Sequence, residues 1–117
     1  MNIRLGLIHA KLARKFGLPA EKRDVYLDDG TLNSIARAIP ESYLRFLERV
    51  ADAIRKPDFV RVNDTKTEVS LIRFTVEENK IVTHFVTLIR GASGWFYANY
   101  QQTTACSGTD IRRFIRA

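Results

Sequence analysis

Hydrophobic residues in the first half of the chain recur at helical intervals. The first predicted helix spans residues 2–16 and ends at Gly17, because its apolar side chains are three or four residues apart (Leu5, Ile8, Leu12 and Phe16). Its basic residues lie off this apolar stripe. The segment therefore predicts an amphipathic helix with one basic face.

Two further helices are expected after a short strand at residues 24–27. The stretch Asp28–Thr31 supplies the polar side chains that cap a helix N-terminus. Pro40 is well placed to open the next helix, because its fixed backbone angle suits the first helical turn. The pair Lys56–Pro57 is expected to end that helix, because the residue before a proline avoids helical geometry.

From Phe59 onward the hydrophobic period changes to two. Residues 59–62, 68–76, 80–90 and 95–104 are predicted strands, and their short turns favour antiparallel neighbours. Thr109 or Asp110 could cap a final helical turn. The sequence thus predicts a single α+β domain over 1–117, with N-terminal helices packed on one face of a four-stranded antiparallel sheet. It is mainly helical over 1–57, sheet over 58–105 and a short C-terminal helical turn over 106–117.

The turn lengths set an expected register for this sheet, with Val76 paired to Ile81 and Arg90 to Trp95. One face, expected to be the core beneath the helices, then carries Ile72, Phe74, Val76, Ile81, Phe85, Ile89, Phe96, Ala98 and Tyr100. The other face, expected to be open, carries Arg73, His84, Arg90, Tyr97, Asn99, Gln101 and Thr103 among Leu71, Val82, Val86 and Leu88. On this open face Arg73 is expected across from His84, and His84 across from Gln101.

Such a row of side chains suits a phosphodiester. Arginine binds phosphate oxygens in a bidentate way, histidine moves a proton near neutral pH, and tyrosine stacks on a base. RNA brings its own nucleophile, the 2′-hydroxyl, so acid–base groups and a cation suffice for cleavage. We assign Arg73 as phosphate clamp, His84 as general acid or base and Thr103 as an orienting hydroxyl. The residues assigned to nucleic-acid contact are Lys11, Lys15, Arg90, Tyr97 and Gln101. The plainer interpretation, solvated side chains on a half-exposed face, stays open.

Composition favours a polyanionic partner. The chain has 19 Lys and Arg against 13 Asp and Glu, a formal net charge of +6. Its single cysteine, Cys106, cannot form an internal disulfide, and no apolar stretch reaches the roughly 18 residues of a membrane helix. The expected location is the cytoplasm, without membrane contact. No metal-ligand spacing or phosphate-binding glycine loop is present, so no metal and no cofactor are expected.

The run VYLDDGTLNSIARAIPESYLRFLERVADAIRKPDFVRVN, followed by SLIRFTV and YANYQQTT, resembles the barnase/EndoU/colicin/RelE-like nuclease superfamily, in its small phage-encoded branch. The resemblance covers residues 24–104 and follows the order strand, helix, proline, helix, strands. It implies a helical portion on a four-stranded sheet and metal-independent RNA cleavage, in a phage or toxin setting. It also implies helix histidines where this chain has Asn33, Ser34 and Ala38, so that His84 or His9 would replace them.

Three functions remain open at this point. The leading one is an RNA-directed protein of nuclease-like fold, an endoribonuclease if its site is active. The second is a catalytically inert nucleic-acid-binding module, which the absent helix histidines favour. The third is a protein-interaction module, such as an inhibitor or immunity factor that recognises an acidic partner, with Trp95, Tyr97 and Arg90 as interface anchors. Besides RNA, the expected partners include a protein such as an antitoxin or immunity protein.

Overall fold

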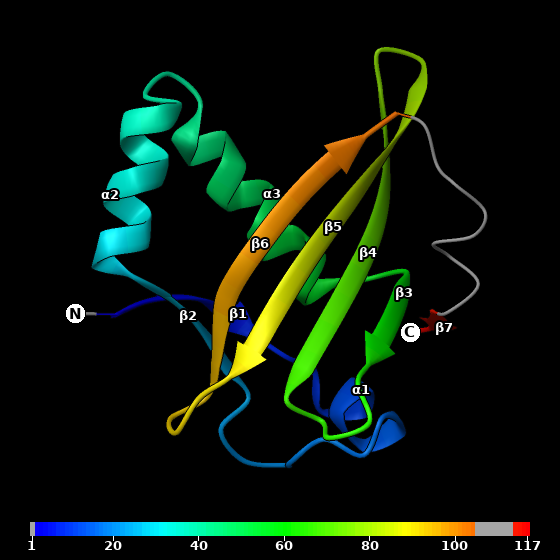
Figure 1. Ribbon diagram of the computed structural model, residues 1–117. Coiled ribbons are helices and arrows are strands. Elements are labelled where there is room, and N and C mark those ends of the chain that lie inside the picture. Colours follow the sequence, from blue (N-terminus) through cyan, green and yellow to red (C-terminus); the bar gives the residue numbers. More distant parts are fainter. Residues whose placement is uncertain (1, 105–113) are drawn as a thin grey trace.

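A single mixed sheet dominates the computed structural model, which describes residues 2–104 and 114–117 (Figure 1). Its strand order is β1-β2-β6-β5-β4-β3-β7. The strands are β1 (Asn2–Leu7), β2 (Asp24–Asp28), β3 (Phe59–Val62), β4 (Glu68–Glu77), β5 (Lys80–Arg90), β6 (Trp95–Thr103) and β7 (Ile115–Arg116). The helices are α1 (Ala10–Lys15), α2 (Asp29–Ala38) and α3 (Tyr43–Arg55). Strand β2 runs parallel to β6, and the other neighbours are antiparallel.

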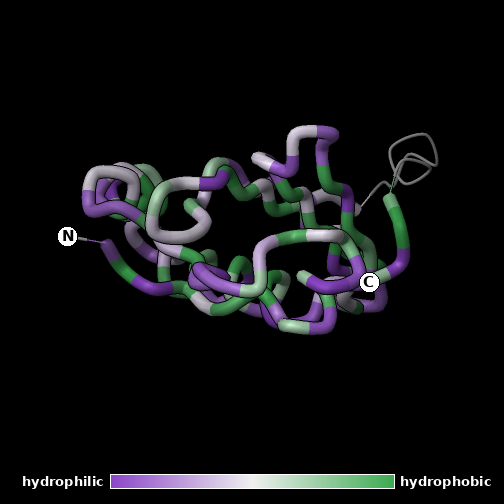
Figure 2. The backbone as a smooth tube through the Cα atoms, turned by 90° about the horizontal axis from the view of Figure 1, so that it is seen from below, coloured by the Kyte–Doolittle hydropathy of each residue, from purple (hydrophilic) through white to green (hydrophobic). Residues whose placement is uncertain are grey.

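The expected fold class is therefore wrong. Instead of N-terminal helices packed on a four-stranded antiparallel sheet, the described residues form a mixed sheet of seven strands with three short helices. The four expected strands are present as β3 to β6, and the sheet extends beyond them on both sides. Strands β1 and β2 continue it past β6, and β7 continues it past β3, so the two termini lie at opposite edges (Figures 1 and 2).

The first segment is the largest local error of the sequence analysis. Residues 2–7 are not helical but form the edge strand β1, which pairs with β2 through an irregularity between Arg4 and Gly6. A glycine inside a helix costs about 1 kcal/mol relative to alanine, which disfavours the helix at Gly6. The helix shrinks to α1, and the Nδ1 atom of His9 caps it by accepting the Lys11 backbone N–H at 3.1 Å.

The other predicted helix ends agree with the structure only in part. The Asp28 side chain caps α2, accepting the Thr31 backbone N–H at 2.8 Å, as predicted. Helix α3 begins at Tyr43 and not at Pro40, and ends at Arg55. Residues 105–113 lie outside the described part of the chain, and with them Cys106 and the proposed cap at Thr109 or Asp110. Residues 115 and 116 pair with β3 as strand β7, so the predicted C-terminal helical turn is wrong there.

The strand register agrees with prediction until the middle of β6. Arg73 pairs with His84, Val76 with Ile81 and Arg90 with Trp95. Between Thr87 and Leu88 of β5 the register then shifts, because Thr87 pairs with Asn99 whereas Leu88 pairs with Tyr97. This bulge leaves Ala98 as an extra residue, so the following side chains of β6 exchange faces relative to the prediction.

The core lies on the face that was expected to be open. Helices α1 and α3 pack there, and their buried residues share one cluster with those of the sheet, among them Leu12, Val50, Ala53, Ile54, Val60, Val69, Leu71, Val86 and Leu88. On the face expected to be core, Val76 is 75% exposed and Ile81 is 62% exposed.

No helix among the described residues has both the length and the apolar character that crossing a membrane requires.

Candidate functional site

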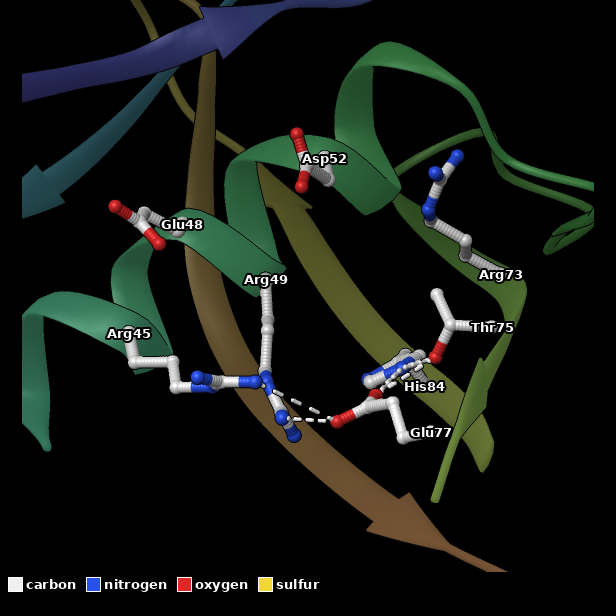
Figure 3. Close-up of a pocket in the computed structure, with 8 residues that line it drawn as sticks. All are labelled: Arg45, Glu48, Arg49, Asp52, Arg73, Thr75, Glu77 and His84. Carbon is white, nitrogen blue, oxygen red and sulfur yellow. Dashed lines mark hydrogen bonds and ion pairs between the residues drawn. The ribbon is translucent and has the colours of Figure 1, made fainter. Parts of the chain in front are cut away.

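A pocket opens between α3 and the sheet, where α3 crosses β4 and β5. We call it the α3 pocket; it is lined by Arg45, Glu48, Arg49, Asp52, Arg73, Thr75, Glu77 and His84, and its volume is about 350 Å³ (Figure 3). The four helix residues are three or four positions apart, so they share one side of α3. The three β4 residues alternate along the strand, so they share one face of the sheet. Helix and strand periodicity thus bring two charged stripes together.

Glu77 lies among arginines at the mouth of this pocket. Its Oε1 atom accepts a hydrogen bond from Nη2 of Arg49 and lies 3.9 Å from Nη2 of Arg45 (Figure 3). Its other oxygen accepts the Thr75 hydroxyl at 2.8 Å. The Glu77 side chain is 27% exposed, so a molecule in the pocket can reach it. The result is an accessible carboxylate held between cations.

Behind Glu77 runs a closed series of hydrogen bonds that we call the hydrogen-bonded ring. It consists of Glu77, Thr75, His84, Tyr100, Gln102 and Arg49. Nε2 of His84 lies 2.7 Å from the Thr75 hydroxyl oxygen, and Nδ1 lies 2.7 Å from the Tyr100 hydroxyl oxygen. The Tyr100 hydroxyl donates to Gln102 at 2.9 Å. Arg49 donates to both Gln102 and Glu77 and closes the ring.

Packing seals the inner part of this ring from solvent. The His84 side chain is only 2% exposed. The Tyr100 ring stacks on the His84 ring with their centroids 6.0 Å apart. Phe46 of α3 packs edge-on against Tyr100 and also against Tyr97, at 4.9 and 6.0 Å. His84 is therefore shielded from solvent, whereas the Glu77 carboxylate is 27% exposed at the pocket.

The ionisation of these groups follows from their surroundings. The hydrogen bond from Thr75 lowers the pKa of Glu77, and Arg49 adds to the lowering against the opposing effect of burial. Burial lowers the pKa of His84, Arg49 lowers it further, and the Glu77 carboxylate partly opposes them. Burial raises the pKa of Tyr100. At neutral pH the site thus combines an ionised Glu77 with a neutral, buried His84.

Arg73 of β4 also lines the pocket. One of its terminal nitrogens, Nη1, donates to the backbone carbonyl of Lys56 at 3.0 Å, just beyond the end of α3. Its Nε atom is buried without a hydrogen-bond partner among the described residues. Because a guanidinium carries five N–H donors, Arg73 keeps donors for an anion in the pocket.

The structure brings together two of the three residues that were assigned a catalytic role. Arg73 and His84 pair across β4 and β5 and both line the α3 pocket. Thr103 pairs with Thr83, on the opposite face of the sheet, because the bulge in β6 moves it there. Gln102 takes the position across from His84 that was expected for Gln101. His84 is also buried, whereas an open position was expected.

The residues assigned to nucleic-acid contact do not gather in one place. Gln101 is exposed on the face away from α3, paired with Phe85. Tyr97 is half-buried beneath Phe46, so its ring has no open face there for a base. Lys11 is exposed on α1, and Arg90 lies at the far end of β5. Lys15 lines a second, basic hollow together with Arg14, Arg61, Lys66 and Asp64, among others.

Sequence reasoning missed three charged members of the site, Glu77, Arg45 and Arg49. A signal for them was present. Arg45, Glu48, Arg49 and Asp52 form a charged stripe at positions i, i+3, i+4 and i+7 of a helix, beside its apolar stripe. Because charged side chains at the edge of a packed face lose part of their contact with water, they indicate polar or charged partners on the sheet. Arg73, Thr75 and Glu77 alternate along one strand and supply them.

Within residues 2–104 and 114–117, no group of three or more His, Cys, Asp or Glu side chains could hold a metal ion.

Comparison with known proteins adds no relative, since the chain matches no family model, no curated protein and no solved structure. The resemblance to the barnase/EndoU/colicin/RelE-like nucleases therefore stays an inference from sequence pattern.

Proposed function

We propose that this chain binds RNA in the α3 pocket and cleaves it there by attack of the 2′-hydroxyl on the adjacent phosphate. The observation that carries the proposal is the accessible Glu77 carboxylate between Arg49 and Arg45, with Arg73 lining the same pocket. A base beside guanidinium groups is the combination that transesterification of RNA requires.

The residues would have distinct roles. Glu77 would take the proton of the 2′-hydroxyl, while the bond from O2′ to phosphorus forms and the bond from phosphorus to O5′ breaks. The departing O5′ would take a proton from water. Arg45 and Arg73 would bind the phosphate oxygens, on which negative charge increases during the reaction. The formal net charge of +6 would attract the RNA. The setting we propose is a phage or toxin nuclease acting in the cytoplasm, with an antitoxin-like protein as a further partner.

His84 would not meet the RNA. Its 2% exposure and its two hydrogen bonds leave no surface for direct contact with a substrate. We therefore move the role of the base from His84 to Glu77 and retain Arg73 as phosphate clamp.

A second function, binding of RNA without cleavage, has one observation in its favour. In-line cleavage is fastest when an acid protonates O5′ on the side opposite to the base, and the buried His84 cannot reach that position. This alternative keeps the arginines as phosphate ligands and gives Glu77 no chemical role.

The experiment is incubation of the purified chain with cellular RNA in EDTA, followed by sequencing of fragment ends and assay for 2′,3′-cyclic phosphate. Glu77→Gln removes the proposed base, and Glu78→Gln removes the same charge from the next residue, which is exposed in the turn. We expect cyclic-phosphate ends with wild type and with Glu78→Gln, and a loss of cleavage of about 100-fold or more with Glu77→Gln. Intact RNA in every sample would reject cleavage, and salt-dependent binding would then support the second function.

A further inference from the structure

Arg49 fixes the direction of hydrogen bonding at both ends of the ring. Its two terminal nitrogens face Oε1 of Glu77 and Oε1 of Gln102. A guanidinium only donates hydrogen bonds, so the Gln102 atom that faces it must be the amide oxygen. Tyr100 meets this same oxygen, and Thr75 meets the other carboxylate oxygen of Glu77. The series from Glu77 to Gln102 therefore starts and ends on an acceptor.

Between these two acceptors the protons can be counted. Four contacts follow one another: Glu77–Thr75 at 2.8 Å, Thr75–His84 at 2.7 Å, His84–Tyr100 at 2.7 Å and Tyr100–Gln102 at 2.9 Å. Each contact needs one proton between its two heavy atoms. The two hydroxyls supply one each and a neutral imidazole supplies one, which gives three. One further proton is needed before all four contacts are hydrogen bonds.

That further proton can be bound at either of two groups of the ring, His84 or Glu77. With Glu77 ionised, His84 carries it, and both ring nitrogens donate. With His84 neutral, Glu77 carries it and donates to Thr75, whose own hydroxyl proton then turns to Nε2 of His84. In both arrangements Nδ1 of His84 donates to Tyr100 and Tyr100 donates to Gln102. Nε2 of His84 also lies 3.4 Å from Oε2 of Glu77, but the shorter contacts between the two sites, at 2.7 and 2.8 Å, run through the Thr75 hydroxyl.

The charged and titratable groups around His84 come from three elements. They are Arg73 and Glu77 on β4, Tyr100 on β6, and Arg45, Glu48, Arg49 and Asp52 on α3. Burial and Arg49 lower the pKa of His84, so the ring lacks its fourth proton at neutral pH. One contact then joins two lone pairs, so the hydrogen-bonding geometry of the ring leaves a position for one further proton.

We propose that Thr75 and His84 receive the proton that Glu77 removes from its substrate, so that the hydrogen-bonded ring and not Glu77 alone is the base of the site. This inference rests on the proposed cleavage of RNA. The transfer conserves protons: the O–H bond at Glu77 breaks as Thr75 takes that proton, while the former hydroxyl proton of Thr75 forms an N–H bond at Nε2 of His84. Glu77 is ionised again and Thr75 is unchanged. Thr75 and His84 are positioning residues in this scheme, because neither touches the RNA.

The test uses the full chain without RNA, so it is independent of whether cleavage occurs. The ¹⁵N signals of the His84 ring report which nitrogen carries a proton at each pH. Glu77→Gln places an amide N–H where Oε2 now accepts, and all four contacts are then met with a neutral His84 protonated on Nδ1. We expect this variant to show Nδ1–H and an unprotonated Nε2.

Thr75→Val and Thr75→Ser form the matched pair, since only serine keeps the hydroxyl. We expect the proton affinity of His84 to fall about tenfold, or about one pH unit, in Thr75→Val and to stay near that of wild type in Thr75→Ser. The backbone amide spectrum of each variant confirms its fold. A proton on Nε2 in Glu77→Gln, or the same His84 titration in Thr75→Val and wild type, would overturn the proposal. Absence of RNA cleavage with the expected ¹⁵N result would reject only the proposed function.

Discussion

The two faces of the sheet carry side chains of the same strands but differ in how far these side chains are buried. The face beneath α3 combines an apolar core with the buried hydrogen-bonded ring, and its His84 is 2% exposed. The opposite face leaves Val76 and Ile81 exposed at 75% and 62%. Apolar content alone therefore does not tell which face a helix covers. On the covered face α3 also places Arg49 against two acceptors of the sheet, Glu77 and Gln102.

The largest expected contrast between the faces is in stability. Ile54 on α3 is 1% exposed and Ile81 is 62% exposed. We expect Ile54→Ala to lower the free energy of unfolding by about 2–5 kcal/mol, because it leaves a cavity in the core. The same change at Ile81 is expected to stay within about 0.5 kcal/mol. Urea denaturation measures both, and equal losses would show that the open face is packed in solution.

A smaller contrast compares two half-buried threonines on opposite faces. Thr75 belongs to the hydrogen-bonded ring, whereas Thr87 of β5 lies on the open face. We expect Thr75→Val to cost about 1–3 kcal/mol, because Glu77 and His84 each lose a partner. Thr87→Val is expected to change stability by no more than about 0.5 kcal/mol. Urea denaturation of both variants at pH 7 measures the two losses, and an unchanged stability of Thr75→Val would show that the Thr75 hydroxyl adds nothing to the ring.

The buried His84 on the face beneath α3 also makes the stability of the chain depend on pH. His84 titrates at its ordinary value of 6.5 in the unfolded chain and lower in the folded chain, because burial disfavours its charge. Between these two values the unfolded chain binds more protons, so the free energy of unfolding falls as pH falls below 6.5. Glu77, whose pKa is also lowered, adds a further loss only below about its ordinary 4.5.

We expect His84→Gln to reduce the slope of stability against pH between pH 6.5 and the lower folded pKa. Urea denaturation of wild type and variant at a series of pH values measures the two slopes. Parallel slopes would mean that His84 titrates alike in the folded and unfolded chains.

The smallest expected effect concerns the dependence of RNA binding on salt. If Arg45 contacts a phosphate of single-stranded RNA, Arg45→Ala should reduce the slope of log affinity against log salt by about 0.7. Arg37→Ala removes an exposed arginine from α2, outside the α3 pocket, and is expected to leave the slope unchanged. Titrations at several salt concentrations measure this, and equal slopes for Arg45→Ala and wild type would exclude that contact.

Periodicity predicted the strands β3 to β6 and the pairing of Arg73 with His84, because short turns leave little freedom of register. It failed at residues 2–7, where the spacing of Leu5, Ile8 and Leu12 fits a helix although the backbone pairs with β2. Long-range pairing overrides local pattern in such a segment.

The candidate site was only partly predictable for a related reason. A bulge at Ala98 cannot be read from strand alternation, and it moves Thr103 away from His84 and brings Tyr100 and Gln102 toward it. The contribution of α3 depends on which face it covers. Arg45 and Arg49 therefore entered the site only once the packing was known.

The most direct test of RNA binding in the α3 pocket is to determine which face of the sheet the RNA contacts. A 2′-O-methyl oligoribonucleotide cannot be cleaved by its own 2′-oxygen, so it can be titrated into the full chain while NMR shifts are followed. We expect the shifts to concentrate on the α3 pocket, at Arg45, Arg49, Arg73 and Glu77. Shifts centred on the exposed side chains of the opposite face, at Val76, Ile81 and Gln101, would contradict it.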